Sequence, residues 1–229
     1  MEDRLKNQPR ILLINDMAGY GKVALSVMIP VFSHMKYETF NLPTVLISNT
    51  LDYGNFDILD TTEYMQNTLR VWNELQFSFD AICTGFIVSE RQASLVYEYC
   101  KEQRKKGHVI KTSCTKFEMK DIADRLHELG AKAVVITSAN IDGKMFTVVK
   151  NSLHSEMTLI PYEEIPVRFP GTGDVFMAIV VGHYLRSGKL SESVQTAMHQ
   201  LEKIIRSNIN NTDKYKGIPI EQFLEDIQL

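Results

Sequence analysis

The sequence is poor in the residues that mark several classes of protein. Its 229 residues include three cysteines, Cys83, Cys100 and Cys114, at spacings that match neither a zinc site nor a disulfide framework. No apolar run approaches the roughly 18 residues of a membrane-spanning helix, and the polar start MEDRLKNQPR lacks the apolar core of a signal peptide. We therefore expect a soluble protein of the reducing cytoplasm.

Concentrated positive charge is also missing. The formal net charge is −3, and the densest basic stretch, EQRKKGH at 102–108, is short. A nucleic-acid surface needs clustered lysine and arginine side chains that contact phosphates. The six histidines show no metal-ligand spacing, and no Ser-His-Asp or Cys-His set can be assembled from neighbouring motifs. We therefore expect neither a nucleic-acid nor a membrane partner, and hydrolase chemistry is disfavoured.

Short apolar runs alternate with segments of helical periodicity along the whole chain. Strands are expected at 11–15, 44–48, 80–87 and 133–139, and helices at 23–35, 60–75, 89–107 and 117–132. Two further strands at 145–149 and 157–165 suit a hairpin-like pair, and helices follow at 171–185, 191–209 and 219–227. This alternation predicts βαβ units and a largely parallel sheet covered by helices, in one domain over residues 1–229.

Polar and aromatic residues follow several of the expected strands. Asp16, Asn49, Phe86 and Thr137 all stand at such strand ends. In open sheets of parallel strands, ligands bind beyond the carboxyl ends. The sequence therefore predicts a binding site at this edge.

The stretch RFPGTGDVF at 168–176 places glycines and a carboxylate directly before an apolar helix. The first turn of a helix leaves backbone N–H groups unpaired, and with the helix dipole they attract phosphate or a developing oxyanion. Asp174, on that first turn, could take a proton from an attacking hydroxyl or could simply cap the helix. The motif alone leaves both roles open.

The stretch GHVIKTSCTK at 107–116 does not continue the alternation as expected. Only residues 108–110 are strand-like before polar residues intervene, whereas strands usually run to about five or six residues. Strand material is therefore expected to be missing near Ile110 and Lys111.

Five motifs together resemble the pyridoxal kinase family of the ribokinase-like superfamily. They occur in the family's order over nearly the whole chain, as ILLINDMAGYGKVALS (11–26), LISNTLDYG (46–54), CTGFI (83–87), VVITS (134–138) and GTGDVF (171–176). The resemblance implies a three-layer α/β/α fold with a largely parallel central sheet.

The resemblance also implies roles for individual residues. Asp174 matches the catalytic base of the family. The amide cradle for the transferring phosphate falls on Gly171, Thr172 and Gly173, and nucleotide contacts fall on Thr137, Ser138 and Thr172.

Substrate contacts fall on Asp16, Val23, Asn49, Thr50 and Phe86. Asp16 stands where the family commonly has a serine that hydrogen-bonds the pyridine ring, and Phe86 stands where it commonly has a tyrosine. An acidic Asp16 could favour a cationic substrate such as pyridoxamine, or could instead cap the following turn.

Another departure from the family lies between Ile110 and Lys111. There the family carries an Asp-Pro-x-x-Gly-Asp motif and a Thr-Pro-Asn strand end with a metal-linked glutamate, and neither is present. Either the deletion is genuine or a segment is missing from the sequence. We expect either a wide separation between these two residues or a vacant strand position with an open nucleotide side.

The resemblance implies ATP-dependent phosphorylation of the 5′-hydroxymethyl group of pyridoxal, pyridoxine or pyridoxamine, with Mg²⁺, by a homodimer. Loss of the metal-linked segment should weaken phosphoryl transfer, because Mg²⁺ relies on one or two protein carboxylates. The alternatives are a hydroxymethylpyrimidine kinase and a non-catalytic protein that binds vitamer or nucleotide.

Overall fold

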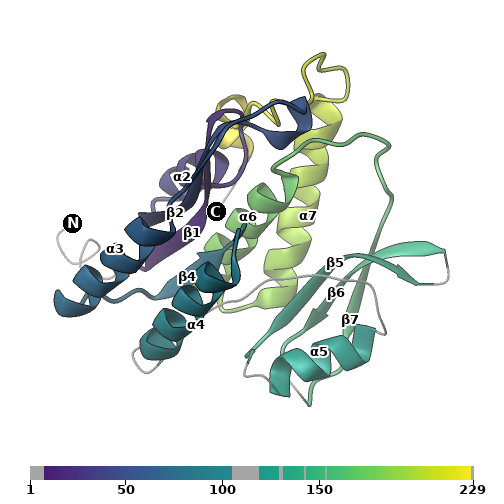
Figure 1. Ribbon diagram of the computed structural model, residues 1–229. Coiled ribbons are helices and arrows are strands. Elements are labelled where there is room, and N and C mark those ends of the chain that lie inside the picture. Colours follow the sequence, from purple (N-terminus) through teal and green to yellow (C-terminus); the bar gives the residue numbers. More distant parts are fainter. Residues whose placement is uncertain (1–7, 105–118, 129–130, 142, 153, 228–229) are drawn as a thin grey trace, which may run out of the picture.

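Two β-sheets and their flanking helices form the computed structural model (Figure 1). The structure describes residues 8–104, 119–128, 131–141, 143–152 and 154–227. The first sheet has the strand order β3-β2-β1-β4. Its strands are β1 (Arg10–Tyr20), β2 (Glu38–Asn49), β3 (Ile58–Asp60) and β4 (Ala81–Thr84). β1 pairs in parallel with β2 and β4, while β3 runs antiparallel along β2.

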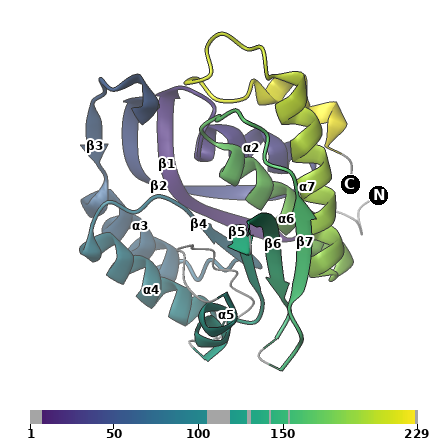
Figure 2. The same cartoon turned by 90° about the vertical axis from the view of Figure 1, so that its right-hand side faces the viewer.

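The apolar run of β1 is buried on both faces of this sheet. Ile11 and Leu13 pack toward α2 (Leu25–His34) and α6 (Thr172–Ser187), with α7 (Leu190–Ser207) beside α6. Leu12 and Ile14 pack on the opposite side, toward α3 (Thr62–Glu74) and α4 (Glu90–Arg104). Figure 2 shows these helices on the two sides of the sheet. Burial on both faces explains why the strand reads as a continuous apolar run.

The second sheet is antiparallel throughout. Its strands β5 (Val134–Ile141), β6 (Lys144–Lys150) and β7 (Thr158–Tyr162) follow one another in order, which confirms the hairpin-like pair. α5 (Met119–Glu128) packs on one face through Ala123. On the other face, Val149 and Ile160 join the same apolar core as α6 and α7. The prediction of a largely parallel sheet therefore holds for the first sheet and not for this one.

Several sequence expectations about element bounds are wrong; β2, for example, begins at Glu38 and not at residue 44, and β4 ends at Thr84 and not at residue 87. β1 continues to Tyr20 because it stays paired with β2 through the glycine-containing stretch, and a register shift between Asn15 and Met17 marks a bulge at Asp16. Asp16 thus lies inside a strand, which removes the turn-capping role considered for it.

Thr137 likewise lies inside β5, in a bulge rather than at the strand end. The expected helix at 219–227 is a pair of short 3₁₀ turns, Ile220–Gln222 and Leu224–Asp226, since nine residues are too few for a stable isolated helix.

The irregular stretch at 107–116 lies outside the described residues. So do the predictions made for it: the strand at 108–110, the link between Ile110 and Lys111, and the helix ends at Gly107 and Gly130. Among the described residues, β4 pairs only with β1 and β5 only with β6, so no hydrogen-bonded strand joins the two sheets. None of the helices in this described part has the length and apolarity that a membrane crossing requires.

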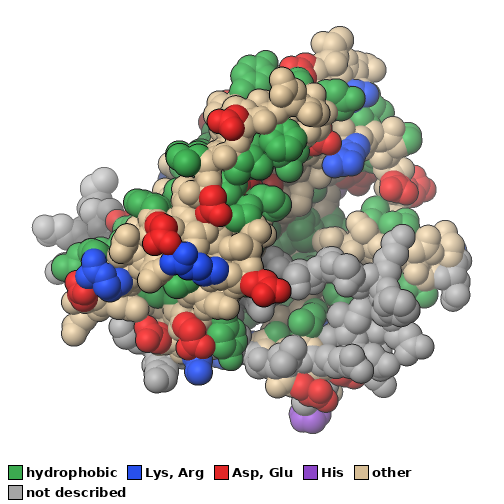
Figure 3. Space-filling model, viewed as in Figure 1, with side chains coloured by type: hydrophobic (Ala, Val, Ile, Leu, Met, Phe, Trp, Pro, Cys, Tyr) green, Lys and Arg blue, Asp and Glu red, His purple; other side chains and the backbone are tan. Residues whose placement is uncertain are grey.

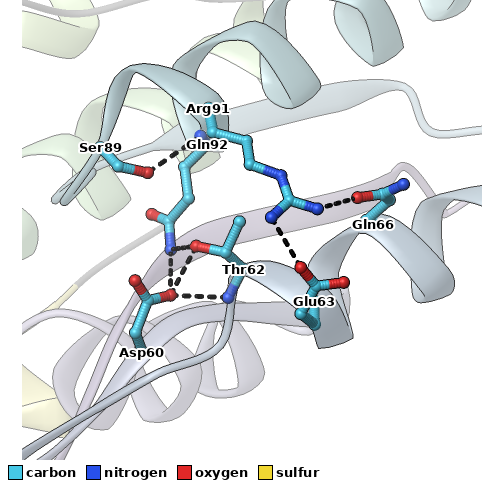
Figure 4. Close-up of polar contacts among 7 residues, drawn as sticks. All are labelled: Asp60, Thr62, Glu63, Gln66, Ser89, Arg91 and Gln92. Atoms are coloured by element: carbon cyan, nitrogen blue, oxygen red, sulfur yellow. Dashed lines mark hydrogen bonds and ion pairs between the residues drawn. The ribbon is translucent and has the colours of Figure 1, made fainter.

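A polar junction holds α4 against the first sheet and α3 (Figure 4). The fully buried Gln92 donates through Nε2 to the Thr44 carbonyl (2.8 Å), to Thr62 Oγ1 (3.0 Å) and to Asp60 Oδ1 (3.3 Å). Ser89 Oγ accepts from the Gln92 N–H at 3.2 Å, as expected for a residue that caps α4. This junction lies on the α3 and α4 side of the sheet, opposite to α6.

Candidate active site

Gly171 begins α6 in a conformation that suits glycine alone. Its φ is +83°, and a β-carbon there would lie 2.5 Å from the carbonyl oxygen of Lys22 and 3.1 Å from Cα of Val23. The Val175 N–H donates to the Gly171 carbonyl at 3.0 Å, so the amides of residues 172–174 precede this helical bond. The expected cradle of backbone amides is therefore placed at the mouth of α6, close to the chain before α2.

Asp174 is held by donors from outside its own helix. Its Oδ1 accepts from Asn15 Nδ2 at 3.1 Å, and its Oδ2 accepts from the Ala24 N–H at 3.0 Å. Burial raises the pKa of the carboxyl, and the hydrogen bonds from Ala24 and Asn15 oppose that rise. The Asp174 oxygens thus face β1 and the start of α2, which is unlike the geometry of a cap on α6.

Ala24 has a strained backbone at this contact. Its φ is +48°, in the left-handed region that side chains with a β-carbon rarely adopt. Strain of this kind persists only where the surrounding structure enforces it, and it is often found at functional sites. Here it directs the Ala24 N–H toward Asp174.

Asn15 is a site residue that the sequence reasoning missed. Its side chain is 2 % exposed, and its Oδ1 accepts from the backbone N–H groups of Asp16 (3.0 Å) and Phe86 (2.7 Å) while Nδ2 contacts Asp174. The one available signal was an amide directly after the buried run ILLI. A buried amide requires partners, but nothing in the sequence said which.

Asp16 is a second acidic group near Asp174. It is 8 % exposed, and no ion pair among the described residues includes it. Burial, and then the negative charge of Asp174, raise the pKa of Asp16 from 3.8 to about 6, against a lowering effect of its backbone hydrogen bond. The negative charge of Asp174 therefore makes ionisation of Asp16 less favourable.

A cavity of about 1300 Å³ opens between the two sheets. Its walls include Thr172, Gly173 and Asp174 from α6, together with Thr137 and Ser138 from β5. The bulge in β5 occurs at these last two residues, and Ser138 has a φ of +58°. Figure 3 shows the molecule hollowed between the sheets. The structure thus gathers the predicted base, amide cradle and nucleotide residues around one space.

The predicted substrate residues are more dispersed, and none of them lines this cavity. Val23 packs beside Gly171, and the Phe86 backbone is tied to Asn15 while its side chain is 41 % exposed. Asn49 Nδ2 donates to the Asn55 carbonyl at 2.9 Å.

Thr50 is engaged with a distant part of the chain. Its Oγ1 donates to the Tyr215 carbonyl at 2.6 Å, while the Lys22 N–H donates to the Lys216 carbonyl at 2.7 Å. The segment 215–217 therefore connects the ends of β1 and β2. Substrate contact by Asn49 and Thr50 stays a prediction.

The described residues offer no resident metal site. No group of three or more His, Cys, Asp or Glu side chains in them is placed to hold an ion. Glu163 and Glu164 line the cavity with Asp174 without forming such a group. The amides at the mouth of α6, in contrast, suit a phosphate.

Comparison with known proteins finds a family model that matches part of the chain and solved structures with a similar fold. The model of the phosphomethylpyrimidine kinase family matches residues 107–218. A candidate phosphomethylpyrimidine kinase from Bacteroides thetaiotaomicron, crystallised with pyridoxal, is 24% identical with a TM-score of 0.86 over 97% of this chain and 96% of that chain.

Two pyridoxal kinases are also similar in structure. The Lactobacillus plantarum enzyme is 18% identical with a TM-score of 0.81, over 96% of this chain and 97% of that chain. The Leishmania donovani enzyme, in complex with ADP and pyridoxamine, is 17% identical with a TM-score of 0.71 over 96% of each chain. The family model thus covers just under half of the chain, and the solved structures share the fold of nearly all of it.

Proposed function

We propose that this chain transfers the γ-phosphoryl group of ATP to the 5′-hydroxymethyl group of a vitamin B6 vitamer. The observation that carries the proposal is the placement of Asp174. It lies on the first turn of α6, is oriented by Asn15 and Ala24, and borders the cavity that also holds Thr137 and Ser138. In this proposal residues 1–229 form one kinase domain.

The chemistry assigned to the residues is proton removal and charge stabilisation. ATP supplies the phosphoryl group, and Mg²⁺ bound to its phosphates neutralises part of their charge. Asp174 takes the proton of the attacking hydroxyl as the new oxygen–phosphorus bond forms and the bond to the ADP oxygen breaks. The amides of Thr172 and Gly173 stabilise negative charge on the transferring group. The raised pKa of Asp174 suits this role, because a base works best when its pKa approaches the working pH.

Relatives support both ligands of the proposed reaction. The Leishmania donovani pyridoxal kinase holds ADP with pyridoxamine, and the Bacteroides thetaiotaomicron structure holds pyridoxal. A second candidate, hydroxymethylpyrimidine kinase activity, is favoured by the family model that matches residues 107–218. Both reactions phosphorylate a hydroxymethyl group on a nitrogen heterocycle, so the same base serves either.

A substrate panel tests the proposal. Purified protein is incubated with ATP and Mg²⁺ and with pyridoxal, pyridoxine, pyridoxamine or hydroxymethylpyrimidine, and phosphorylated products are measured by mass spectrometry. We expect vitamer 5′-phosphate above the level given by the Asp174→Asn variant. Product only from hydroxymethylpyrimidine would favour the second candidate. Vitamer binding without product at every Mg²⁺ concentration would leave a binding protein instead of a kinase.

A further inference from the structure

We infer that Asn15 is a positioning residue for the reaction: its amide group sets the orientation and charge state of Asp174 and links the base to the segment after β4. The inference rests on the proposed function, since it takes Asp174 as the group that accepts a proton. Its test is chosen so that the contact and the activity are measured separately.

The orientation of the Asn15 amide is fixed by its partners. Its oxygen accepts two backbone N–H groups, from Asp16 at 3.0 Å and Phe86 at 2.7 Å. The amide nitrogen must therefore face Asp174 Oδ1, at 3.1 Å, because a flipped amide would set N–H against N–H. An ionised carboxylate accepts hydrogen bonds and donates none, so Asn15 presents the polarity that favours ionised Asp174.

Close packing leaves the Asn15 amide little freedom. A β-carbon on Gly85 would lie 2.3 Å from Cγ, Oδ1 and Nδ2 of Asn15, so the backbone after β4 lies directly against the amide. On the other side Nδ2 is 3.7 Å from the sulfur of Met28, in α2. An amide that is 2 % exposed and confined in this way holds its partner in one geometry, which general-base catalysis requires.

Asn15 also connects the base to a second part of the site. The same side chain bonds Asp174, at the mouth of α6, and the Phe86 N–H, just beyond β4. Movement of the segment at Gly85 and Phe86 is therefore transmitted to the base through one amide. Exposure of the Phe86 side chain leaves it accessible to a ligand.

The first variant is Asn15→Asp, which keeps the shape and the two acceptor contacts but replaces the donor to Asp174 with an oxygen. The pKa of Asp174 is read by NMR of carboxyl carbons, with Asp174→Asn identifying the signal. We expect this pKa to rise, and the acidic limb of the kcat profile to move to higher pH with it. At pH 7 we expect kcat to fall about 10- to 100-fold with a smaller change in KM, as for loss of a hydrogen bond to a charged group.

Asn15→Asp introduces one carboxyl group, whose negative charge adds to the rise in the Asp174 pKa, and the other charged groups around the site stay constant. They are Asp16, Lys22, Asp80, Lys132, Glu163 and Glu164. The matched control is Asn73→Asp, because Asn73 Nδ2 also donates to a carboxylate, Glu102 Oε2, at 2.9 Å, but does so on the exposed surface of α3 and α4. The control should leave kcat, its pH profile and the Asp174 pKa unchanged.

The second variant, Gly85→Ala, moves the Asn15 amide without changing either polar group. Gly85 has no left-handed φ, so the added methyl group acts through its contact with Asn15. We expect the same direction of change in the Asp174 pKa and kcat. An unaltered Asp174 pKa in both folded variants would overturn the inference whatever the activity. A shifted pKa in a protein that phosphorylates no substrate would uphold the contact while removing the proposed function.

Discussion

Asp60 and Asp174 both stand at the start of a helix, and they differ in what their oxygens contact. Asp60 precedes α3, and the shorter contacts of its Oδ1 are to that helix: it accepts from the Thr62 N–H at 2.7 Å and from the Thr62 hydroxyl, with a longer contact from Gln92 Nε2 at 3.3 Å. Asp174 lies on the first turn of α6, but its oxygens accept from Asn15 and Ala24, on other elements.

The pKa values of Asp60 and Asp174 are shifted in opposite directions. The hydrogen bonds from Thr62 lower the pKa of the exposed Asp60, whereas burial raises that of Asp174. A capping carboxylate is stabilised in its ionised form, and a base is held where ionisation is less favourable. Position at a helix start therefore does not decide the role of an aspartate. Its donors and its burial do.

The largest expected effect separates the two aspartates by activity. Asp174→Asn should lower kcat about 10²- to 10⁴-fold, the usual contribution of a general base, while vitamer binding measured by calorimetry is largely kept. Asp60→Asn, the matched control on α3, should leave kcat unchanged. Equal turnover by wild type and Asp174→Asn would show that Asp174 is not the base.

Asp16 is a buried aspartate that lies in a strand and not at a helix start. Its substitution therefore tests whether burial raises the pKa of a carboxyl group that is not at a helix start. Its pKa of about 6 in the folded protein exceeds the ordinary 3.8, so the folded state binds more protons between these values and stability falls as pH rises through them. Above about pH 6 the full penalty is present, at most about 3 kcal/mol. Asp16→Asn should raise the melting temperature at pH 7 and flatten its pH dependence between about pH 4 and 6. A variant with the wild-type pH dependence would contradict the assignment.

The same variant addresses substrate choice. If Asp16 favours cationic substrates, Asp16→Asn should raise KM for pyridoxamine more than KM for pyridoxal. Parallel changes for both vitamers would show that Asp16 does not select between them.

The helix that carries Asp174 begins with a glycine, Gly171. Gly171→Ala places a β-carbon 2.5 Å from the Lys22 carbonyl oxygen at a φ of +83°. We expect a loss of at least about 2 kcal/mol in the free energy of unfolding, measured with denaturant. Gly188→Ala is the control at the other end of α6, where φ is +69° but the space is open, and it should lose only about 1 kcal/mol. Equal losses would mean that the Lys22 contact is unimportant.

The smallest expected effect concerns the cap on α3. Asp60→Ala should lower the free energy of unfolding by about 1 kcal/mol, as for other lost caps, with kcat unaffected. Because the pKa of Asp60 is lowered, its contribution is present at neutral pH and is lost as pH falls through its folded-state pKa. Urea unfolding of both proteins at pH 7 and at low pH would show the difference shrinking on acidification.

Local patterns in the sequence were sufficient to predict the helix at Asp174 and most other elements. The Gly-Thr-Gly stretch before an apolar run predicts the start of α6, and the apolar run ILLI predicts β1. The bounds failed where pairing overrode local signals. The glycines after Asp16 indicated a turn, but hydrogen bonds to β2 keep that stretch extended.

The donors of Asp174 could not be predicted, because they come from far away in the sequence. Asn15 is 159 residues from Asp174 and Ala24 is 150 residues away. The spacing of motifs does not predict contacts between residues so far apart in the sequence. The sequence alone therefore gives no partner for the Asn15 amide. The sequence shows that Asp16 is an acidic residue where the resembling family commonly has a serine. It does not predict the raised pKa of Asp16, because that depends on burial and on the charge of Asp174.

The link between segment 215–217 and the ends of β1 and β2 has a consequence for synthesis of the protein. The Lys22 N–H donates to the Lys216 carbonyl and the Thr50 hydroxyl donates to the Tyr215 carbonyl, so the ends of β1 and β2 are joined by residues that are made much later. At about 5–20 residues per second, a ribosome needs about 10–40 s to proceed from Lys22 to Lys216. Throughout that interval β1 and β2 lack these two contacts, so the chain around Asp174 can reach its final arrangement only after residues 215–216 have been made.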